Sequence, residues 1–178
     1  MKPVLETARL ALRELSLDDL DFVAGMLAHP EVMRFYPKTY SRDESRLWIE
    51  RQLQRYAGNG HGLWLVQDRA TGEPVGQVGL ILQLVEGVEE PEIGYLIHRP
   101  FWRRGFATEA ALAVRSWAFD TLGLERVISL IRPENTPSQG VARKLGMTPA
   151  KRAQFHWLEH IVFAVRREEV NTSISTPQ

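Results

Sequence analysis

The segment from Pro91 to Ala110 constrains the fold of this chain more than any other. It contains a short apolar strand, a loop rich in arginine, and a glycine, Gly105, that precedes a helical pattern. Apolar residues recur after Gly105 at the three- and four-residue spacing of one helix face, and Gly123 ends the pattern. A helix that begins at a glycine directly after a strand presents free backbone N–H groups and the positive end of its dipole. This arrangement predicts a phosphate-binding loop.

Three arginines, Arg99, Arg103 and Arg104, add positive charge beside this glycine. The loop matches neither of the two common phosphate loops. It lacks the G-x-x-x-x-G-K-[ST] pattern, and it lacks the three glycines and the ribose-binding acid of a dinucleotide fold. The alternative is that Gly105 serves only helix–strand packing and that the arginines belong to a solvated loop.

Residues 102–107, Trp-Arg-Arg-Gly-Phe-Ala, resemble the pyrophosphate-binding motif Q/R-x-x-G-x-G/A of the GNAT superfamily of N-acetyltransferases. Tryptophan in the first position is typical of the branch that resembles ribosomal-protein alanine and serine acetyltransferases. Residues 5–13, 30–35 and 123–147 resemble further segments of that branch, in the same order. Since four segments agree in order, the resemblance covers nearly the whole chain.

The resemblance implies an α/β fold in a single domain, residues 1–170, followed by a flexible tail at 171–178. The expected sheet is mixed, mostly antiparallel and twisted, with flanking helices and a V-shaped split between its two central strands. The patterns predict strands at 9–13, 63–67, 75–84, 93–98 and 126–131, a final hairpin reaching 167, and helices over 16–29, 41–56, 105–122 and 136–146. We expect Ser41 and Glu44 to form a capping box, Thr136 to cap the last helix, and residues 86–91 to be an acidic loop.

Composition narrows the function classes. The chain has 178 residues, 44% of them hydrophobic and 25% charged, and its formal net charge is zero, so nothing indicates nucleic-acid or membrane-surface binding. No apolar run approaches the length of a membrane span, and we expect a cytoplasmic protein, monomeric or homodimeric. There is no cysteine, which excludes disulfides, thiolate metal ligands and an acyl-cysteine intermediate.

The resemblance implies acetyl-CoA as the acyl donor and an amine as the acceptor. The pantetheine arm is expected to bind between the diverging strands through backbone groups of Tyr95, Leu96 and Ile97. The amides of a run of six residues are expected to hold the pyrophosphate: Arg103, Arg104, Gly105, Phe106, Ala107 and Thr108. Asn135, eleven residues before Gly146, matches the asparagine that contacts the pantetheine or the reacting amide. Its alternative is an ordinary turn residue.

Only a neutral amine attacks a thioester, so a base must remove the ammonium proton. Glu92, at the start of the central strand, is the best-placed candidate, and the alternative is a strand-edge carboxylate paired with an arginine. The resemblance implies that Ser138 donates a hydrogen bond to the leaving sulfur, although a serine there also permits close packing. Many family members carry a tyrosine, acting as general acid, where this chain has Ala142. Either Ser138 or a water molecule takes over that role, or no acid is needed because a thiolate is already a tolerable leaving group. Weaker base candidates are His98, Glu109 and His160.

Several large side chains are candidates for lining the acceptor groove, with a core position as the alternative: Met33, Phe35, Tyr36, Trp48 and Trp64. The acidic residues Glu86, Glu89 and Glu90 would attract a cationic acceptor, although a run of acids is usually a solvated loop.

Residues 156–160 match the H-x-x-E-H zinc pattern, which requires a helix. The flanking residues alternate as in a strand, where His156 and His160 would be roughly 13 Å apart, so we expect no metal. The sequence therefore predicts an acetyl-CoA-dependent N-acetyltransferase that acts on a primary amine, a protein N-terminus or a small molecule. The alternatives are a catalytically silent acyl-CoA sensor and a zinc hydrolase.

Overall fold

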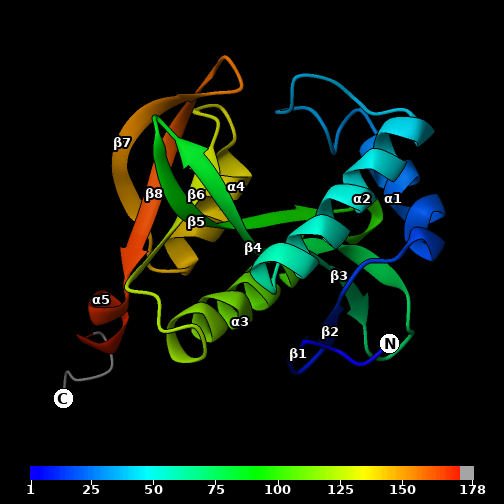
Figure 1. The fold of residues 1–178 in the computed structure, drawn as a ribbon, viewed down its shortest axis with the longest axis horizontal. Helices are drawn as coiled ribbons and strands as arrows, with labels where there is room; N and C mark the ends of the chain where they lie inside the picture. Colours follow the sequence, from blue (N-terminus) through cyan, green and yellow to red (C-terminus); the bar gives the residue numbers. More distant parts are fainter. Residues whose placement is uncertain (173–178) are drawn as a thin grey trace.

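The computed structural model describes residues 1–172, which form one eight-stranded sheet with helices on both faces (Figure 1). The strands are β1 Leu5–Glu6, β2 Leu10–Arg13, β3 Leu63–Asp68, β4 Pro74–Val85, β5 Val88–Ile97, β6 Arg126–Ile131, β7 Thr148–Phe155 and β8 Leu158–Arg166. The helices are α1 Leu20–Leu27, α2 Arg42–Asn59, α3 Phe106–Asp120, α4 Thr136–Lys144 and α5 Arg167–Thr172, with 3-10 turns at Leu17–Asp19 and Arg99–Phe101.

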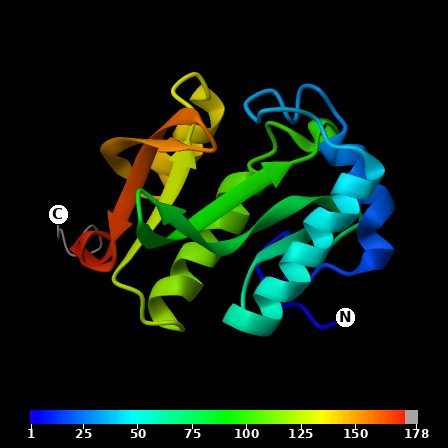
Figure 2. The same ribbon diagram turned by 45° about the horizontal axis from the view of Figure 1, so that its top comes forward.

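The sheet order is β1-β2-β3-β4-β5-β6-β8-β7. Every neighbouring pair is antiparallel except β5 and β6, which are parallel and share a single registered pair, Glu92 with Ile128. Beyond that pair the two strands diverge, as Figure 2 shows. The expected mixed sheet and its V-shaped split are therefore confirmed.

Residues of β3 alternate between two hydrophobic clusters because successive side chains of a strand point to opposite faces. Trp64 and Val66 pack in the larger cluster with α3 and α4, while Leu65 packs with α1 and α2. The indole of Trp64 meets that of Trp117 edge-on, with ring centroids 5.1 Å apart. The sheet is therefore covered by helices on both faces around β3.

The long helix α2 begins and ends as its sequence predicts. Glu44 N–H donates to Ser41 Oγ at 3.2 Å, and Ser41 N–H donates to a Glu44 carboxylate oxygen at 2.8 Å. This is the capping box, which satisfies two N–H groups that have no partner within the helix. Gly60 ends the helix with φ of +75°, a left-handed conformation that glycine adopts without strain.

The acidic loop at residues 86–91 is much shorter than expected. Only Glu86 and Gly87 form the turn, with φ of +49° and +84°, and β5 begins at Val88. A two-residue turn with positive φ at both positions matches the twist of a β-hairpin, so pairing with β4 extends the strand through Glu89, Glu90 and Pro91.

Two helix termini also differ from expectation. Asn135, rather than Thr136, caps α4, because its Oδ1 accepts the Ser138 N–H at 3.2 Å. Gln139 donates to the Arg132 and Pro133 carbonyls instead of completing a capping box. Near the C-terminus, α5 continues to Thr172, so the first two residues of the expected tail belong to a helix, and residues 173–178 lie outside the described residues.

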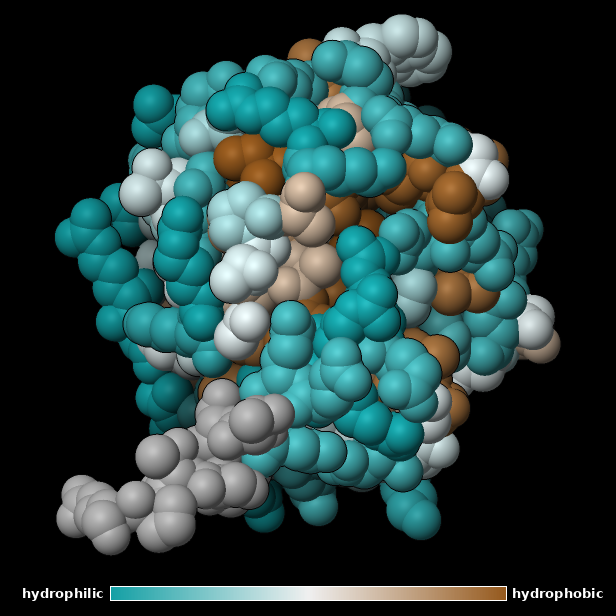
Figure 3. Space-filling model, turned by 90° about the vertical axis from the view of Figure 1, so that its left-hand side faces the viewer, coloured by the Kyte–Doolittle hydropathy of each residue, from teal (hydrophilic) through white to brown (hydrophobic). Residues whose placement is uncertain are grey.

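The edge strand β7 is largely exposed and carries Lys151 and Arg152. Figure 3 shows that the face around β7, β8 and α5 is mostly hydrophilic, with small apolar areas between polar side chains. Charged residues on an edge strand discourage pairing with other chains. Within residues 1–172 no helix has the length and apolar character needed to cross a membrane.

Candidate active site

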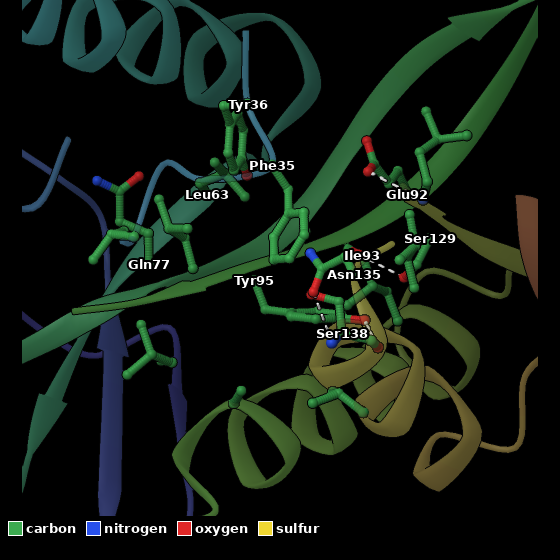
Figure 4. Close-up of a pocket in the computed structure, with 18 of the residues that line it drawn as sticks. Phe35, Tyr36, Leu63, Gln77, Glu92, Ile93, Tyr95, Ser129, Asn135 and Ser138 are labelled. Carbon is green, nitrogen blue, oxygen red and sulfur yellow. Dashed lines mark hydrogen bonds between the residues drawn. The ribbon is translucent and has the colours of Figure 1, made fainter. Parts of the chain in front are cut away.

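A cavity of about 940 Å³ opens where β5 and β6 separate (Figure 4). Its walls come from the segment before α2, from α2 itself, from β4 and β5, from the N-terminal turn of α3, from α4 and from the tip of the β7–β8 hairpin. The cavity therefore brings together segments that are far apart in the sequence.

The split between β5 and β6 leaves backbone groups of β5 without a strand partner. Ser129 Oγ donates to the Ile93 carbonyl at 2.8 Å, which completes the last contact between the strands. Because residues of a strand alternate in direction, Tyr95 and Ile97 turn their backbone groups toward the same opening as Ile93. The Ile97 carbonyl accepts from Trp102 Nε1 at 2.7 Å, so the Tyr95 amide and carbonyl and the Ile97 amide face the split.

The backbone of Leu96 does not face the split, although we expected it to contact the pantetheine arm. It lines the cavity, but its carbonyl points toward β4, where a β-carbon at Gly76 would lie only 2.4 Å from it. Since the N–H and C=O of one strand residue point to the same edge, its backbone serves the β4–β5 ladder.

Helix α4 closes the opposite side of the split. Tyr95 Oη donates to the Ser138 carbonyl at 2.7 Å, which ties β5 to α4. Asn135 and Ser138 both line the cavity, and Figure 4 shows Ser138 beside Tyr95. Among the α4 residues that line the cavity, Ser138 has the only hydroxyl group, whereas Ala142 is fully buried in the larger cluster.

The N-terminus of α3 faces the cavity with bare backbone. Gly105 is the N-cap residue, with φ of +78° and no side-chain cap. The first helical hydrogen bond runs from Glu109 N–H to the Gly105 carbonyl at 3.0 Å, so the amides of Phe106, Ala107 and Thr108 have no acceptor within the helix. These residues and Arg103 line the cavity. Such a terminus suits an anion.

A clamp that the sequence did not reveal holds this loop in place. Arg9 Nε pairs with Glu109 at 2.6 Å, and Arg9 Nη1 donates to the Arg104 carbonyl at 2.9 Å. Glu109, a weaker base candidate, is therefore occupied in an ion pair. Arg104 does not line the cavity; its guanidinium lies over the Phe101 ring, 5.4 Å from the centroid.

Glu92 lies at the vertex of the split, where its side chain is only 8% exposed. Burial raises the pKa of Glu92 from its ordinary value of 4.5 to about 7, although hydrogen bonds from Gln83 and the Leu130 amide and the charge of Arg55 oppose that rise. The Leu130 N–H lies 3.4 Å from Glu92 Oε1. A carboxyl group with a pKa near neutral pH can accept and release a proton under ordinary conditions.

An aromatic wall stands opposite Glu92. Phe35, Tyr36 and Trp48 line the cavity, and Trp48 Nε1 donates to Gln77 Oε1 at 2.8 Å. The expectation for Met33 is wrong: its side chain is 2% exposed, packs with α1 and α2, and is not part of the cavity wall. Trp64 is likewise a core residue.

Comparison with known proteins identifies the family. The model of the acetyltransferase (GNAT) domain matches residues 9–148. The chain belongs to the GNAT acetyltransferase family. It is 34% identical to the uncharacterized protein YkkB of Bacillus subtilis over 151 residues, 84% of this chain and 88% of that protein. It is 31% identical to the uncharacterized N-acetyltransferase YoaA of the same organism, over 82% of this chain and 83% of YoaA. The crystal structure of an acetyltransferase from Agrobacterium tumefaciens superposes with a TM-score of 0.82 and 31% identity, covering 93% and 95% of the two chains.

This GNAT enzyme accordingly uses acetyl-CoA as its acyl donor, and the cavity fits that molecule. The split offers strand-like backbone partners for the amides of a pantetheine arm. The unpartnered amides at the start of α3 offer donors for the pyrophosphate.

The remaining sequence candidates lie apart from this donor site or at its edge. His98 packs against Phe22 and His29 and does not line the cavity. His156 lies in the β7–β8 turn and His160 in β8, so the helix that the zinc pattern requires is not present. Within residues 1–172 no group of three or more His, Cys, Asp or Glu side chains is arranged to hold a metal ion.

Sequence reasoning missed two arginines of this GNAT enzyme, Arg51 and Arg55, which line the cavity. A signal was present, because Trp48, Arg51 and Arg55 are spaced by three and four residues and share one face of α2. A charged helix face of this kind is usually solvated, and only the packing of α2 over β4 and β5 shows that it borders a cavity.

Proposed function

We propose that the enzyme transfers the acetyl group of acetyl-CoA directly to a primary amine, with Glu92 as the general base. The observation that supports this proposal is the place of Glu92, a buried carboxyl at the vertex of the split, between the donor site and the aromatic wall. The acceptor is a protein N-terminus or a small-molecule amine.

In this proposal the residues of the site have separate roles. The Tyr95 and Ile97 amides and the first turn of α3 bind and orient the donor, whose thioester supplies the activated acetyl group. Glu92 accepts the ammonium proton of the acceptor, directly or through a water molecule, which makes the nitrogen a nucleophile. The Tyr95 amide donates to the oxygen on which negative charge develops. The Ser138 hydroxyl donates to the departing sulfur, since Ala142 supplies no acid.

The test is release of free thiol from acetyl-CoA with a panel of primary amines and of peptides with free N-termini. We expect turnover with at least one class and none with the same compounds acetylated beforehand. Tight binding of acetyl-CoA without turnover of any amine would instead support an acyl-CoA sensor.

A further inference from the structure

Two arginines of α2 border the acceptor side of the cavity without a carboxylate partner. Arg51 and Arg55 are one helical turn apart and both line the cavity. Arg51 lies over the Trp48 ring, 5.7 Å from its centroid, and Arg55 Nη1 contacts the Gln52 side-chain oxygen at 3.3 Å. Among residues 1–172 neither guanidinium forms an ion pair, although eleven such pairs occur elsewhere.

The carboxylates near this site do not neutralise the two arginines. Of the two acidic residues that line the cavity, Glu31 pairs with Arg99 at 2.7 Å, and Glu92 lies buried at the vertex. The acidic residues of the β4–β5 hairpin, which were candidates for attracting a cation, lie outside the cavity. Glu86 pairs with Lys151 and Glu90 with Arg126.

Holding two like charges one turn apart is unfavourable. Burial and the charge of Arg51 lower the pKa of Arg55, whereas the charge of Glu92 raises it, and a guanidinium stays protonated in proteins. Glu92 carries at most one negative charge against the two positive charges of Arg51 and Arg55, so a net positive charge remains on this wall of the cavity, beside the aromatic side chains and Gln77. Guanidinium groups in this setting match carboxylate and phosphate, which they bind through parallel hydrogen bonds.

We infer that the acceptor amine carries an anionic group, a carboxylate or a phosphate, which Arg51 and Arg55 bind while the nitrogen reaches Glu92. This inference rests on the proposed function. The aromatic side chains of Phe35, Tyr36 and Trp48 pack against the apolar part that joins the two ends of such an acceptor. A polyamine, which carries several positive charges, meets two arginines and one buried carboxyl group, and is a poor acceptor.

The kinetic test compares acceptors that differ only in the anionic group. One series runs from glycine to 6-aminohexanoate with the corresponding amino amides as neutral controls, and a second pair is 2-aminoethyl phosphate and ethanolamine. For the best chain length we expect kcat/KM to favour the anionic form by about ten- to a hundredfold, as for a hydrogen bond to a charged group. Which series shows the preference distinguishes carboxylate from phosphate.

The double substitution Arg51→Gln, Arg55→Gln should abolish this preference, so that the ratio of kcat/KM for the anionic and neutral acceptors falls to about one. The ratio is measured rather than the rate with neutral amides, because the charge of Arg55 also lowers the pKa of Glu92. Arg46→Gln is the matched control, because Arg46 lies on the same helix, is exposed and does not line the cavity. Arg51→Gln alone, at an exposed position, is the second variant if the double variant melts early. A double variant that keeps the anion preference, or a wild type that favours neutral or cationic amines, overturns the inference.

A binding measurement separates this inference from the proposed function. Calorimetry with the CoA-saturated protein would compare N-acetylated amino carboxylates with the matching N-acetylated amides. We expect about tenfold tighter binding of the carboxylates to the wild type and equal binding to the double variant. Arginine-dependent carboxylate binding without turnover of any amine would refute the proposed function and leave the anion site standing. Turnover of amines without any preference for the anionic compounds in either assay would support the proposed function and refute the anion site.

Discussion

The burial of Glu92 gives this residue a property that an exposed glutamate lacks, a pKa close to neutral pH. Glu92 is 8% exposed, and burial raises the pKa of its carboxyl to about 7. In the proposed reaction the ionised form of Glu92 accepts a proton, so the enzyme should be active above that pH and inactive below it. The same residue should then account for the acid limb of the reaction and for part of the pH dependence of folding.

Glu92→Gln should lower turnover by about 10² to 10⁴, because glutamine keeps the shape and the acceptor for the Leu130 amide but cannot take a proton. The acid limb of kcat/KM near pH 7 should disappear, while the limb that belongs to the amine remains. Steady-state kinetics from pH 5.5 to 9 measure both effects. Ser138→Ala is the control, since it should keep the acid limb. Near-full activity of Glu92→Gln with an unchanged pH profile would show that another group acts as the base.

The same substitution should stabilise the fold at high pH. The folded-state pKa of Glu92 lies above the ordinary value of 4.5, so the folded state binds this proton more tightly, and its stability falls as pH rises from about 4.5 to 7. The shift corresponds to about 3 kcal/mol. Denaturant titrations at pH 4.5 and pH 8 should give the free energy of unfolding of both proteins. Between these two pH values, the difference between Glu92→Gln and the wild type should change in favour of the variant, by an amount that approaches the value given above. A constant difference across that range would contradict the burial of the charge.

At the scale of elements, the donor site combines a strand that loses its neighbour with a helix that begins without a side-chain cap. β5 and β6 share one registered pair, and Gly105 caps α3 with backbone alone. Each feature leaves polar backbone groups that need a partner. A ligand that has both amides and phosphates satisfies both features.

Gly105→Glu should abolish acetyl-CoA binding, because it places a negative charge where the pyrophosphate approaches the α3 amides. Both Gly105→Glu and its control Gly105→Gln share the strain of a side chain at φ of +78°, about 1 to 2 kcal/mol. Calorimetry should therefore show a much larger loss for the glutamate than for the glutamine. Equal affinities for the two variants would indicate that this loop does not contact the phosphates.

For the whole molecule, the cavity lies between segments contributed by both halves of the chain. Its walls include α2 and β4 on one side and α4 and the β7–β8 hairpin on the other, and the adjoining strands β5 and β6 share a single registered pair. A donor bound in the split bridges the two halves and favours the folded state over the unfolded chain.

Acetyl-CoA should accordingly raise the free energy of unfolding, by about 2.7 kcal/mol at a hundred times its dissociation constant. Thermal denaturation with increasing acetyl-CoA measures this, with NAD as the control ligand. A greater effect of NAD, or none of acetyl-CoA, would contradict the assignment of the loop.

Local interactions explain what the sequence alone predicted. The capping box at Ser41 and Glu44, the strand at residues 126–131 and the glycine before α3 depend on side chains and backbone within a few residues. The motif at residues 102–107 rests on the same local geometry. Together with three further segments in the same order it indicated the family, and a strand, a glycine and a helix in succession already form most of a phosphate site.

Tertiary packing decided the rest, because burial and partner choice depend on segments that are distant in the chain. It extended β5 through the acidic residues by pairing it with β4, and it placed Met33 in the core and Phe35 in the cavity wall. It also set the pKa of Glu92, which depends on how completely the surrounding elements exclude water. The sequence determined a GNAT fold and the helix start that we assign to the phosphates, because both depend on local pattern. The packing of α2 beside β4 determined which charges border the cavity, because that packing joins segments distant in the chain.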